Sequence, residues 1–314
     1  MTEPGSNYAE TPGEIMNETI EVCVCTFRRE SLAATLASLA AQALPGGLSL
    51  RVIVADNDHT DDRRARIEAA AQTLGIGLCY VHAPARNISI ARNACLTAAS
   101  ADWIAFIDDD EVARPDWLAR LIAARDGHQV VFGVSQAGYP DPATPRWIVA
   151  GDFHSNRLSG NDPPWNGYTA NVLIDRRFTA AHGLRFAEEL GQTGGEDTLF
   201  FYQARGAGAR FGYAPLAIVD EATPLARASL RWLALRRFRA GQIHHMLLRE
   251  QGGAGRGSVA AAAKAGACLI AALIALPRPA RAAAQALRGA LHLGVVAAAL
   301  GFAPYREYAE RKGR

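Results

Sequence analysis

Five short apolar segments alternate with four amphipathic segments between residues 19 and 135, and this alternation limits the fold more than any other feature of the 314-residue chain. The apolar segments have the length and composition of β-strands, whereas the others carry apolar residues at the spacing of one helix face. This pattern predicts a mostly parallel sheet covered by helices, with a ligand at the carboxyl ends of the strands. The expected strands are Ile20–Cys25, Leu50–Ala55, Leu78–His82, Trp103–Ile107 and Val130–Val134, and the expected helices are Ser31–Gln42, Asp61–Leu74, Ile88–Ala99 and Pro115–Arg125.

The fourth expected strand runs directly into four acidic residues, Asp108 to Glu111. Carboxylate oxygens suit Mg²⁺ and Mn²⁺, and a metal at this edge of the sheet can hold a phosphate. Three adjacent aspartates repel one another unless a cation or solvent relieves them. The cluster therefore predicts an enzyme that handles a metal-bound nucleotide. The alternative is an acidic surface turn that leads into the next helix.

Polar residues also follow the first three strands, and the same rule gathers them around one crevice. Thr26–Arg29 follows the first strand, Asp56 and Asn57 follow the second, and Arg86 and Asn87 come after the third. A plain strand-end turn, in which Asp56 bonds its own backbone, is the alternative for that residue.

The regular alternation ends near residue 135. Residues 138–164 are rich in Pro, Gly, Asp and Asn, which predicts a binding loop or lid. A strand at Tyr168–Ile174 and a helix at 176–181 are expected next. Two glycines then precede Glu196 and Asp197, so both carboxylates should lie in the first turn of a further helix. Simple capping of that helix is the alternative to a role in the crevice.

Five motifs occur in one order along the chain: Cys25-Thr-Phe-Arg28, Asp56-Asn57, Asn87-Ile-Ser-Ile-Ala-Arg-Asn93, Asp108-Asp-Asp110 and Gly194-Gly-Glu-Asp197. As an ordered set over about residues 18–241, they resemble the inverting family 2 glycosyltransferases, in particular bacterial enzymes of succinoglycan-type exopolysaccharide synthesis. The resemblance implies an α/β GT-A fold, which is a Rossmann-like mixed sheet flanked by helices. It also implies transfer of a sugar from a nucleotide-diphosphate donor, in first place a UDP-sugar, to a saccharide acceptor.

The resemblance also implies roles for individual residues. Asp108 and Asp110 match the element that holds the donor diphosphate through Mg²⁺ or Mn²⁺, with Asp110 as direct ligand and Asp108 on the ribose or a metal-bound water. Asp197 matches the general base for the acceptor hydroxyl, with Glu196 positioning it or acting as the base itself. Asp56 matches the acid that binds the nucleotide base. The other nucleotide-sugar contacts expected are Thr26, Arg28, Arg92, Asn93, Asp109, Arg236 and Arg237.

Some of these assignments have plainer alternatives. Arg92 could lie on a solvated helix face, and the arginines at 236, 237 and 239 could form a merely solvated basic helix. Many relatives supply a further metal ligand, often His, downstream of the base. The corresponding stretch here is 219–224, where Asp220 or Glu221 would be the substitute.

Charge divides the chain unevenly. Residues 1–225 carry 18 Lys and Arg against 28 Asp and Glu, whereas residues 226–314 carry 15 against 3. The basic part contains two Ala-rich apolar runs, at 258–276 and 287–304, which suit either a membrane-associated helical hairpin or a soluble helical pair. We expect attachment to the cytoplasmic face of the inner cell membrane, with arginines near the anionic leaflet.

These observations predict four parts: a flexible N-terminus at 1–17, a GT-A catalytic domain at 18–225, a basic helical segment at 226–256, and an apolar helical hairpin at 257–314. The catalytic domain should divide into a nucleotide-binding half, 18–135, and an acceptor half, 136–225. No apolar leader segment stands at the start, and the five cysteines form no CxxC pair, which favours a reducing compartment. No nucleic-acid motif accompanies the arginines.

Two other functions fit parts of the pattern. A sugar-nucleotide nucleotidyltransferase would also use an acidic metal cluster, but the segment after the first strand lacks its glycine-rich basic loop. A membrane-tethered carbohydrate-binding or scaffold protein could use Trp147 and Trp165 to stack on sugar. It would tolerate loss of Asp197, whereas an enzyme would not.

Overall fold

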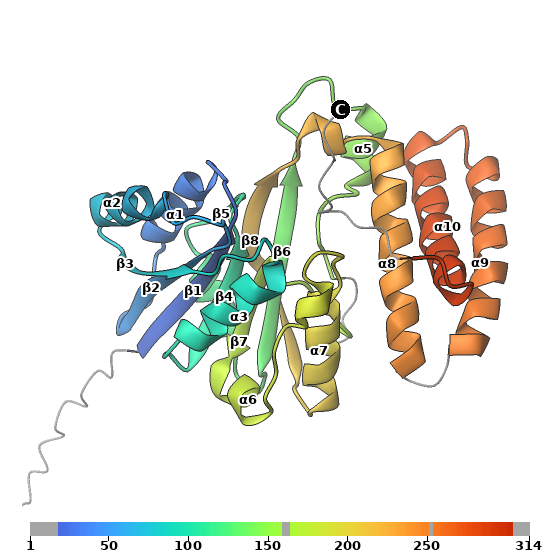
Figure 1. The fold of residues 1–314 in the computed structure, drawn as a ribbon. Coiled ribbons are helices and arrows are strands. Elements are labelled where there is room, and N and C mark those ends of the chain that lie inside the picture. The colour runs from blue at the N-terminus through green and yellow to red at the C-terminus, as the bar shows by residue number, and fades with distance from the viewer. Residues whose placement is uncertain (1–17, 159–163, 251–253, 304–314) are drawn as a thin grey trace, which may run out of the picture.

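The computed structural model describes residues 18–158, 164–250 and 254–303. An eight-stranded mixed sheet forms its centre, in the order β3-β2-β1-β4-β7-β6-β8-β5 (Figure 1). The strands are β1 Glu18–Thr26, β2 Leu48–Asp56, β3 Gly77–His82, β4 Trp103–Asp108, β5 Glu111–Ala113, β6 Val130–Gly138, β7 Asn171–Asp175 and β8 Phe211–Ala222. β3, β2, β1 and β4 are parallel neighbours, as are β6 and β8. β7 pairs antiparallel with both β4 and β6, and β5 pairs antiparallel with β8.

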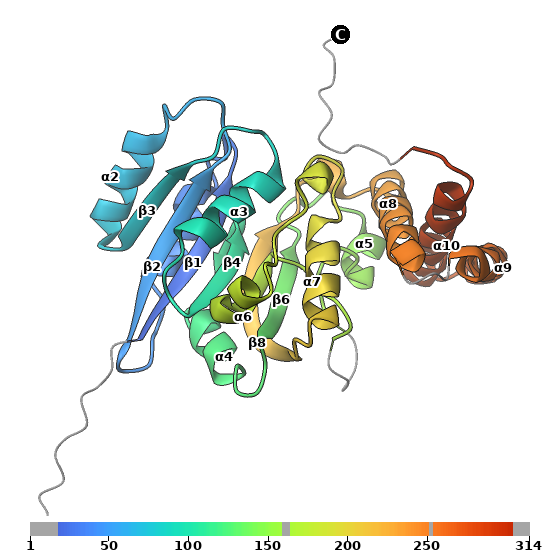
Figure 2. The same ribbon diagram turned by 60° about the horizontal axis from the view of Figure 1, so that its bottom comes forward.

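Helices cover both faces of this sheet (Figure 2). They are α1 Leu32–Ala40, α2 Arg64–Leu74, α3 Ile88–Ala98, α4 Trp117–Ala123, α6 Arg176–Ala181 and α7 Glu196–Gly206, with short 3-10 turns at Glu188–Leu190 and Leu225–Arg227. The short helix α5 Arg146–Gly151 lies apart from these and packs against the C-terminal helices. One core cluster joins the sheet to α1, α2 and α4, and the other joins it to α3 and α7. Strand alternation explains the division, because Val22 and Val24 belong to the first cluster and Cys23 to the second.

Three further helices form a layer at one side of the sheet: α8 Leu230–Glu250, α9 Ala254–Ile274 and α10 Pro279–Ala299. α8 is the innermost of the three and lies beside α5 and α7, α10 packs on α8, and α9 packs on the outer side of α10 (Figures 1 and 2). α8 and α10 touch backbone to backbone, since a Cβ added to Gly294 would lie 1.9 Å from the Phe238 carbonyl oxygen. The segments Gly257–Ile274 and Pro279–Ala299 are long and apolar enough to cross a membrane.

The structure confirms the mixed α/β sheet flanked by helices and each of the nine elements expected between residues 19 and 135. The expected strand at Tyr168–Ile174 begins later, at Asn171, and the irregular stretch 138–164 contains α5. β8 was not expected from the sequence. Pro215 and exposed Leu216 lie within it, so the alternation of apolar residues along it is weak. Residues 1–17, where a flexible N-terminus was expected, lie outside the described residues.

Candidate active site

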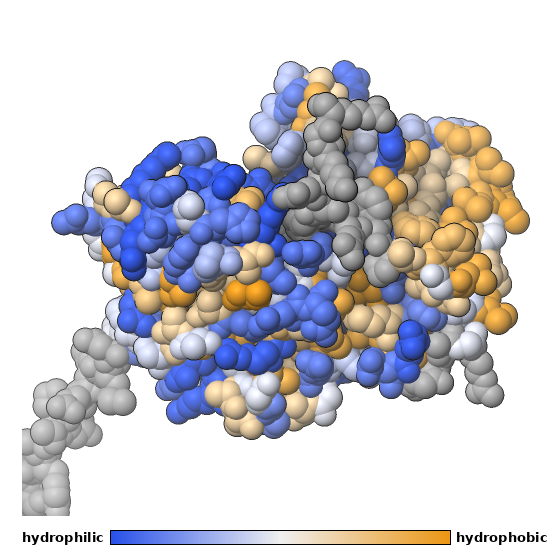
Figure 3. Space-filling view, viewed as in Figure 1, coloured by the Kyte–Doolittle hydropathy of each residue, from blue (hydrophilic) through white to orange (hydrophobic). Residues whose placement is uncertain are grey.

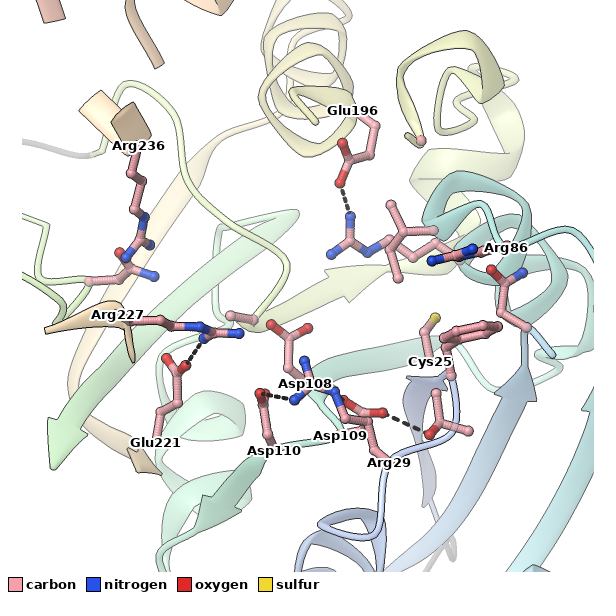
Figure 4. A pocket seen from close by; sticks show the side chains of 18 of the residues that line it. Cys25, Arg29, Arg86, Asp108, Asp109, Asp110, Glu196, Glu221, Arg227 and Arg236 are labelled. Carbon is pink, nitrogen blue, oxygen red and sulfur yellow. Dashed lines mark hydrogen bonds and ion pairs between the residues drawn. The ribbon is translucent and has the colours of Figure 1, made fainter. Parts of the chain in front are cut away.

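A cavity of about 410 Å³ lies at the carboxyl ends of β1 and β4 (Figure 4). Strand register builds its floor, because Thr26 lies beside Asp56 and Cys25 beside Asp108 in neighbouring strands. The walls come from α3, from the first turn of α7, from the end of β8 and from α8. The lining residues used below are Thr26, Arg29, Asn57, Arg86, Arg92, Asp108, Asp109, Asp110, Glu196, Glu221, Arg227, Trp232, Arg236 and Arg239.

The three adjacent aspartates form one side of this cavity, in the turn between β4 and β5. The Thr26 hydroxyl donates a 2.7 Å hydrogen bond to Asp109 Oδ2. The Arg29 guanidinium lies 3.5 Å from Asp110 and 3.9 Å from Asp109. Among the described residues, none forms an ion pair with the Asp108 carboxylate, so negative charge remains in excess at this side of the cavity.

The electrostatics of the cluster reflect that excess. Burial, with repulsion from Asp110, Asp109 and Glu221, raises the pKa of Asp108 to about 7, although Arg92 partly opposes the shift. Burial also raises the pKa of Asp109 to about 6, against the hydrogen bond from Thr26. Buried carboxylates that raise one another's pKa form a site where a cation is favourable.

Glu111 lies behind the aspartates and closes their turn. Its carboxylate accepts a hydrogen bond from the Ser135 hydroxyl and a 3.0 Å bond from the backbone N–H of Asp108. Burial and the charge of Asp108 raise the pKa of Glu111 well above its ordinary value. Glu111 therefore shapes the turn from below rather than lining the cavity.

Of the two acids proposed to replace a downstream histidine, Glu221 lines the cavity and Asp220 does not. Glu221 accepts a 3.0 Å hydrogen bond from Arg227, and burial together with Asp110 raises its pKa. Asp220 makes two 2.9 Å bonds to exposed Arg114. Adjacent strand residues point to opposite sides, so only one of this pair can face the cavity.

The wall opposite the aspartates is a buried ion pair between Arg92 and Glu196 (Figure 4). Asn87 begins α3 by accepting backbone N–H bonds from Ser89 and Ile90, which sets Arg92 in the second turn. Burial alone would lower the pKa of Arg92, but the carboxylates of Glu196, Asp108 and Asp197 outweigh it and raise the pKa. Arg92 is thus a buried, permanently charged wall residue rather than part of a solvated helix face.

The first turn of α7 holds both predicted carboxylates. Gly194 and Gly195 have φ values of 83° and 99°, and a Cβ on Gly195 would meet Ile243 at 2.9 Å, so glycine lets the turn approach α8. Glu196 lines the cavity, whereas half-buried Asp197 lies beside it and accepts a 2.6 Å bond from the Thr198 N–H. Burial and the Glu196 charge raise the pKa of Asp197 to about 6.

Besides Asp197, four other predicted site residues lie away from the cavity lining. Asp56 is fully buried, and its carboxylate accepts bonds from the Tyr80 hydroxyl at 2.9 Å and the Asp58 N–H at 3.1 Å. Arg28 has φ 56° and bonds Asp58 at 2.7 Å. The other two are Asn93, whose amide bonds both backbone polar groups of Phe186, and Arg237 on α8.

Several other lining residues received no binding role from the sequence, although the sheet rule had already placed Arg29 and Asn57 at the crevice. Asn57, next to Asp56, is the residue of that pair that lines the cavity. Likewise, Arg29 lines the cavity and the adjacent Arg28 does not. Arg227 and Trp232 come from the turn and helix after β8, and the Arg227 and Arg236 guanidiniums lie 5.9 and 5.5 Å from the Trp232 ring centroid. Their signal was only the arginine-rich composition of this stretch.

The aspartates do not form a complete metal cage. Within the described ranges, no group of three or more His, Cys, Asp or Glu side chains is arranged to hold a metal ion. Mg²⁺ usually keeps one or two carboxylates and completes its shell with water and substrate phosphates. Asp108 and Asp110, which both line the cavity, fit that kind of shared site.

Comparison with known proteins agrees with this geometry. Residues 21–178 match the model of the family described as "Glycosyl transferase family 2". The chain is 44% identical over 309 residues to the succinoglycan biosynthesis protein ExoM of Rhizobium meliloti (strain 1021). The aligned region covers 94% of this chain and 98% of ExoM.

Two solved structures have a similar fold. The mannosyltransferase PcManGT from Pyrobaculum calidifontis, in complex with GDP-Man and Mn²⁺, gives a TM-score of 0.61 at 19% identity, over 89% of this chain and 86% of that one. S. aureus TarS 1–349 in complex with UDP-GlcNAc gives 0.53 at 16%, over 88% and 90%. This chain spans about half (52%) of the length of a longer S. aureus TarS chain. On its sequence match and its fold together, the chain belongs to glycosyl transferase family 2 and has the GT-A fold.

Proposed function

We propose that this glycosyltransferase is an inverting, metal-dependent enzyme that moves a sugar from a nucleotide-diphosphate donor, in first place a UDP-sugar, to a saccharide acceptor carried on a lipid. The acceptor belongs to the synthesis of a bacterial surface or exopolysaccharide, because the chain is 44% identical to a succinoglycan biosynthesis protein over nearly its full length. We also propose that residues 18–225 form the catalytic domain and that α8 completes its cavity.

The observation that carries this proposal is the pairing of charges across the cavity. Asp108, Asp109 and Asp110 form one side, and Arg227, Arg236 and Arg239 line it from the segment after β8. A donor diphosphate is an anion that can bind arginines directly and carboxylates through a cation. A cavity with both kinds of wall therefore suits a metal-bound diphosphate better than a neutral sugar alone.

Mg²⁺ or Mn²⁺ would be held by Asp110 and Asp108, with Glu221 nearby, and would offset charge on the leaving diphosphate. TarS binds UDP-GlcNAc in its solved structure and PcManGT binds GDP-Man with Mn²⁺, which supports a nucleotide-sugar in this fold. Asn57 and the Thr26 side of the cavity are the proposed contacts for the nucleoside. Asp56, held by Tyr80, supports that wall from behind.

Asp197 is the proposed general base. It takes the proton from the acceptor hydroxyl while that oxygen forms its bond to the anomeric carbon and the bond to the diphosphate breaks on the opposite face. One base is enough for such an inverting step, and no covalent sugar intermediate forms. Glu196 is already engaged by Arg92, so it is suited to orient its neighbour rather than to accept a proton.

The nucleotidyltransferase alternative is set aside by the family assignment. For the acceptor, we propose a lipid-linked saccharide at the cytoplasmic face of the membrane. The two long apolar helices next to α8 support this location, because they would bring the cavity to the surface on which such an acceptor is held.

The test is turnover of a panel of nucleotide-sugars by the purified protein, with Mg²⁺ or Mn²⁺ and then with chelator, using extracted membrane lipid as acceptor. We expect metal-dependent release of one nucleoside diphosphate, lost in Asp110→Ala and Asp197→Asn. Asp220→Asn is the matched control, because this carboxylate is exposed and paired with Arg114. Release that persists with chelator, or in Asp197→Asn, would contradict the proposal.

A further inference from the structure

The outward face of α9 is apolar and is not covered by any other described element. Ala261, Ala265 and Cys268 form its buried stripe, and Cys268 lies against Gly289 of α10. On the opposite side, Val259, Ile270, Leu273 and Ile274 are between 62% and 77% exposed. These four positions follow the spacing of one helix face, so they lie along one side of α9 rather than at scattered positions.

Figure 3 shows this surface as a gathering of apolar side chains over α9 and α10, at the opposite side of the molecule from the more polar surface over α1 and α2. Exposed Leu276, Leu300 and Phe302 extend it at the two ends of the helix pair. Contiguous apolar surface of this kind marks an association site in a soluble protein.

The charges around this surface have one sign. Residues 254–303 contain five Lys and Arg and no Asp or Glu. Lys264 on α9 and Arg288 on α10 are exposed. Burial lowers the pKa of half-buried His292, and the nearby charges of Lys264 and Arg288 lower that pKa further. His244 of α8 contributes to the same effect, so three helices place basic groups together.

The same basic residues argue against a membrane-spanning hairpin. Lys264 lies at the midpoint of α9 and Arg288 next to the midpoint of α10. A spanning arrangement would place both charges near the bilayer centre, where they are costly. α10 is also held by α8, whose Arg236 and Arg239 line the cavity, and it could not enter a bilayer without leaving that contact.

We infer that α9 and α10 form an interfacial docking surface for a lipid bilayer with anionic headgroups. The apolar stripe of α9 lies at the boundary between headgroups and acyl chains, while Lys264, Arg288, Arg278 and Arg281 contact the phosphates. α10 lies between α8 and most of the length of α9, so the cavity, which α8 lines, stands beside the membrane surface without entering it. This deepens the membrane location proposed above and rests on it for its biological role.

Flotation of the full chain with vesicles tests the surface without any turnover. We expect binding to phosphatidylcholine vesicles that contain phosphatidylglycerol, weaker binding at high salt, and little binding to phosphatidylcholine alone. The double variant Ile270→Asp with Leu273→Asp should bind at least about tenfold more weakly, because two exposed side chains lose their apolar insertion. Leu216→Asp, at an equally exposed leucine on β8, should bind like the unaltered protein.

The basic residues have their own variant. Lys264→Glu with Arg288→Glu should remove the preference for anionic vesicles, whereas Arg120→Glu with Arg177→Glu, at exposed arginines of the catalytic part, should retain it. Circular dichroism and cooperative thermal unfolding show whether each variant is folded. Folded variants that bind as before would overturn the inference.

Three further results would also overturn it. The unaltered protein could fail to bind vesicles, it could resist alkaline extraction from cell membranes as a spanning protein does, or Ile270→Asp could dissolve a dimer in the absence of lipid. Because vesicle binding is measured without donor or acceptor, its failure would leave the proposed transfer reaction untouched. If the unaltered protein bound vesicles but showed no turnover, only the proposed transfer reaction would be contradicted.

Discussion

The cavity and the α9–α10 pair differ in the kind of side chain that each leaves without a partner. The cavity gathers carboxylates and arginines that are partly buried and paired with one another, as Arg92 is with Glu196. The α9–α10 pair has no acidic residue, packs largely through small side chains, and leaves most of the large apolar side chains of α9 exposed. Burying charge is costly unless it has a partner, and exposing apolar area is costly unless a partner covers it. Both regions are therefore incomplete as they stand, one towards a small charged ligand and the other towards an extended apolar surface.

The largest expected effect comes from breaking the charge pairing in the cavity. Arg92→Leu leaves the carboxylate of Glu196 buried without its cation, and the pair is less than a tenth exposed on both sides. We expect a loss of roughly 3–5 kcal/mol in the free energy of unfolding. Urea denaturation measures it. Arg92→Leu combined with Glu196→Leu should recover most of the loss, and a double variant no more stable than the single one would contradict this account.

The contact that joins the two regions is the next most sensitive point. A side chain at Gly294 would collide with the backbone of α8 at Phe238. We therefore expect Gly294→Val to cost about 1–3 kcal/mol of stability, because α10 must move away from α8. Thermal unfolding followed by circular dichroism is the measurement. Gly266→Val on α9, where an added Cβ meets nothing within 4 Å, is the control, and equal losses in both would show that the close contact is unimportant.

The pH dependence of turnover sharpens the contrast between paired and unpaired carboxylates. A general base works only when ionised, and burial raises the pKa of Asp197 to about 6, so kcat should fall about tenfold per pH unit below that value. An unshifted aspartate would keep its activity down to about pH 4. Saturating donor and metal keep the aspartate cluster from contributing to the profile.

Glu196→Gln tests the cause of that shift. The variant removes the negative charge of Glu196, which raises the pKa of Asp197, and keeps the positive charge of Arg92, which lowers it. The pKa of Asp197 should therefore fall. The acidic limb of kcat against pH should move to lower pH, even if the rate itself is reduced. An unmoved limb would show that a group other than Asp197 controls the profile.

The smallest effect is expected at the exposed ion pair between Arg114 and Asp220. Arg114→Ala removes the partner of Asp220, but both side chains are nearly half exposed, so the ion pair contributes about 1 kcal/mol or less. Unfolding in urea at low and high salt should show little difference from the unaltered chain. A loss comparable to that of Arg92→Leu would mean that burial is not what separates the two pairs.

Most of the fold could be predicted because its signals are local. The elements from Ile20 to Val134 have distinct periods and clear turn residues, and the sheet rule then brought the ends of β1 and β4 together correctly. β8 was missed because Pro215 and Leu216 interrupt its alternation, and its position depends on pairing with β6 and β5, which are distant in sequence. Without β8, the contributions of Arg227 and Trp232 could not be placed.

The sequence by itself determined the acidic turn at Asp108–Asp110, the glycine-led pair Glu196 and Asp197, and the apolar, basic character of the last helices, because each is a matter of neighbours along the chain. The tertiary structure alone decided which member of an adjacent pair faces the cavity. Asn57 lines it rather than Asp56, Arg29 rather than Arg28, and Glu221 rather than Asp220. The physical reason is that successive side chains in extended backbone point to opposite sides, so one residue of register or one turn at φ 56° selects the residue that meets the ligand.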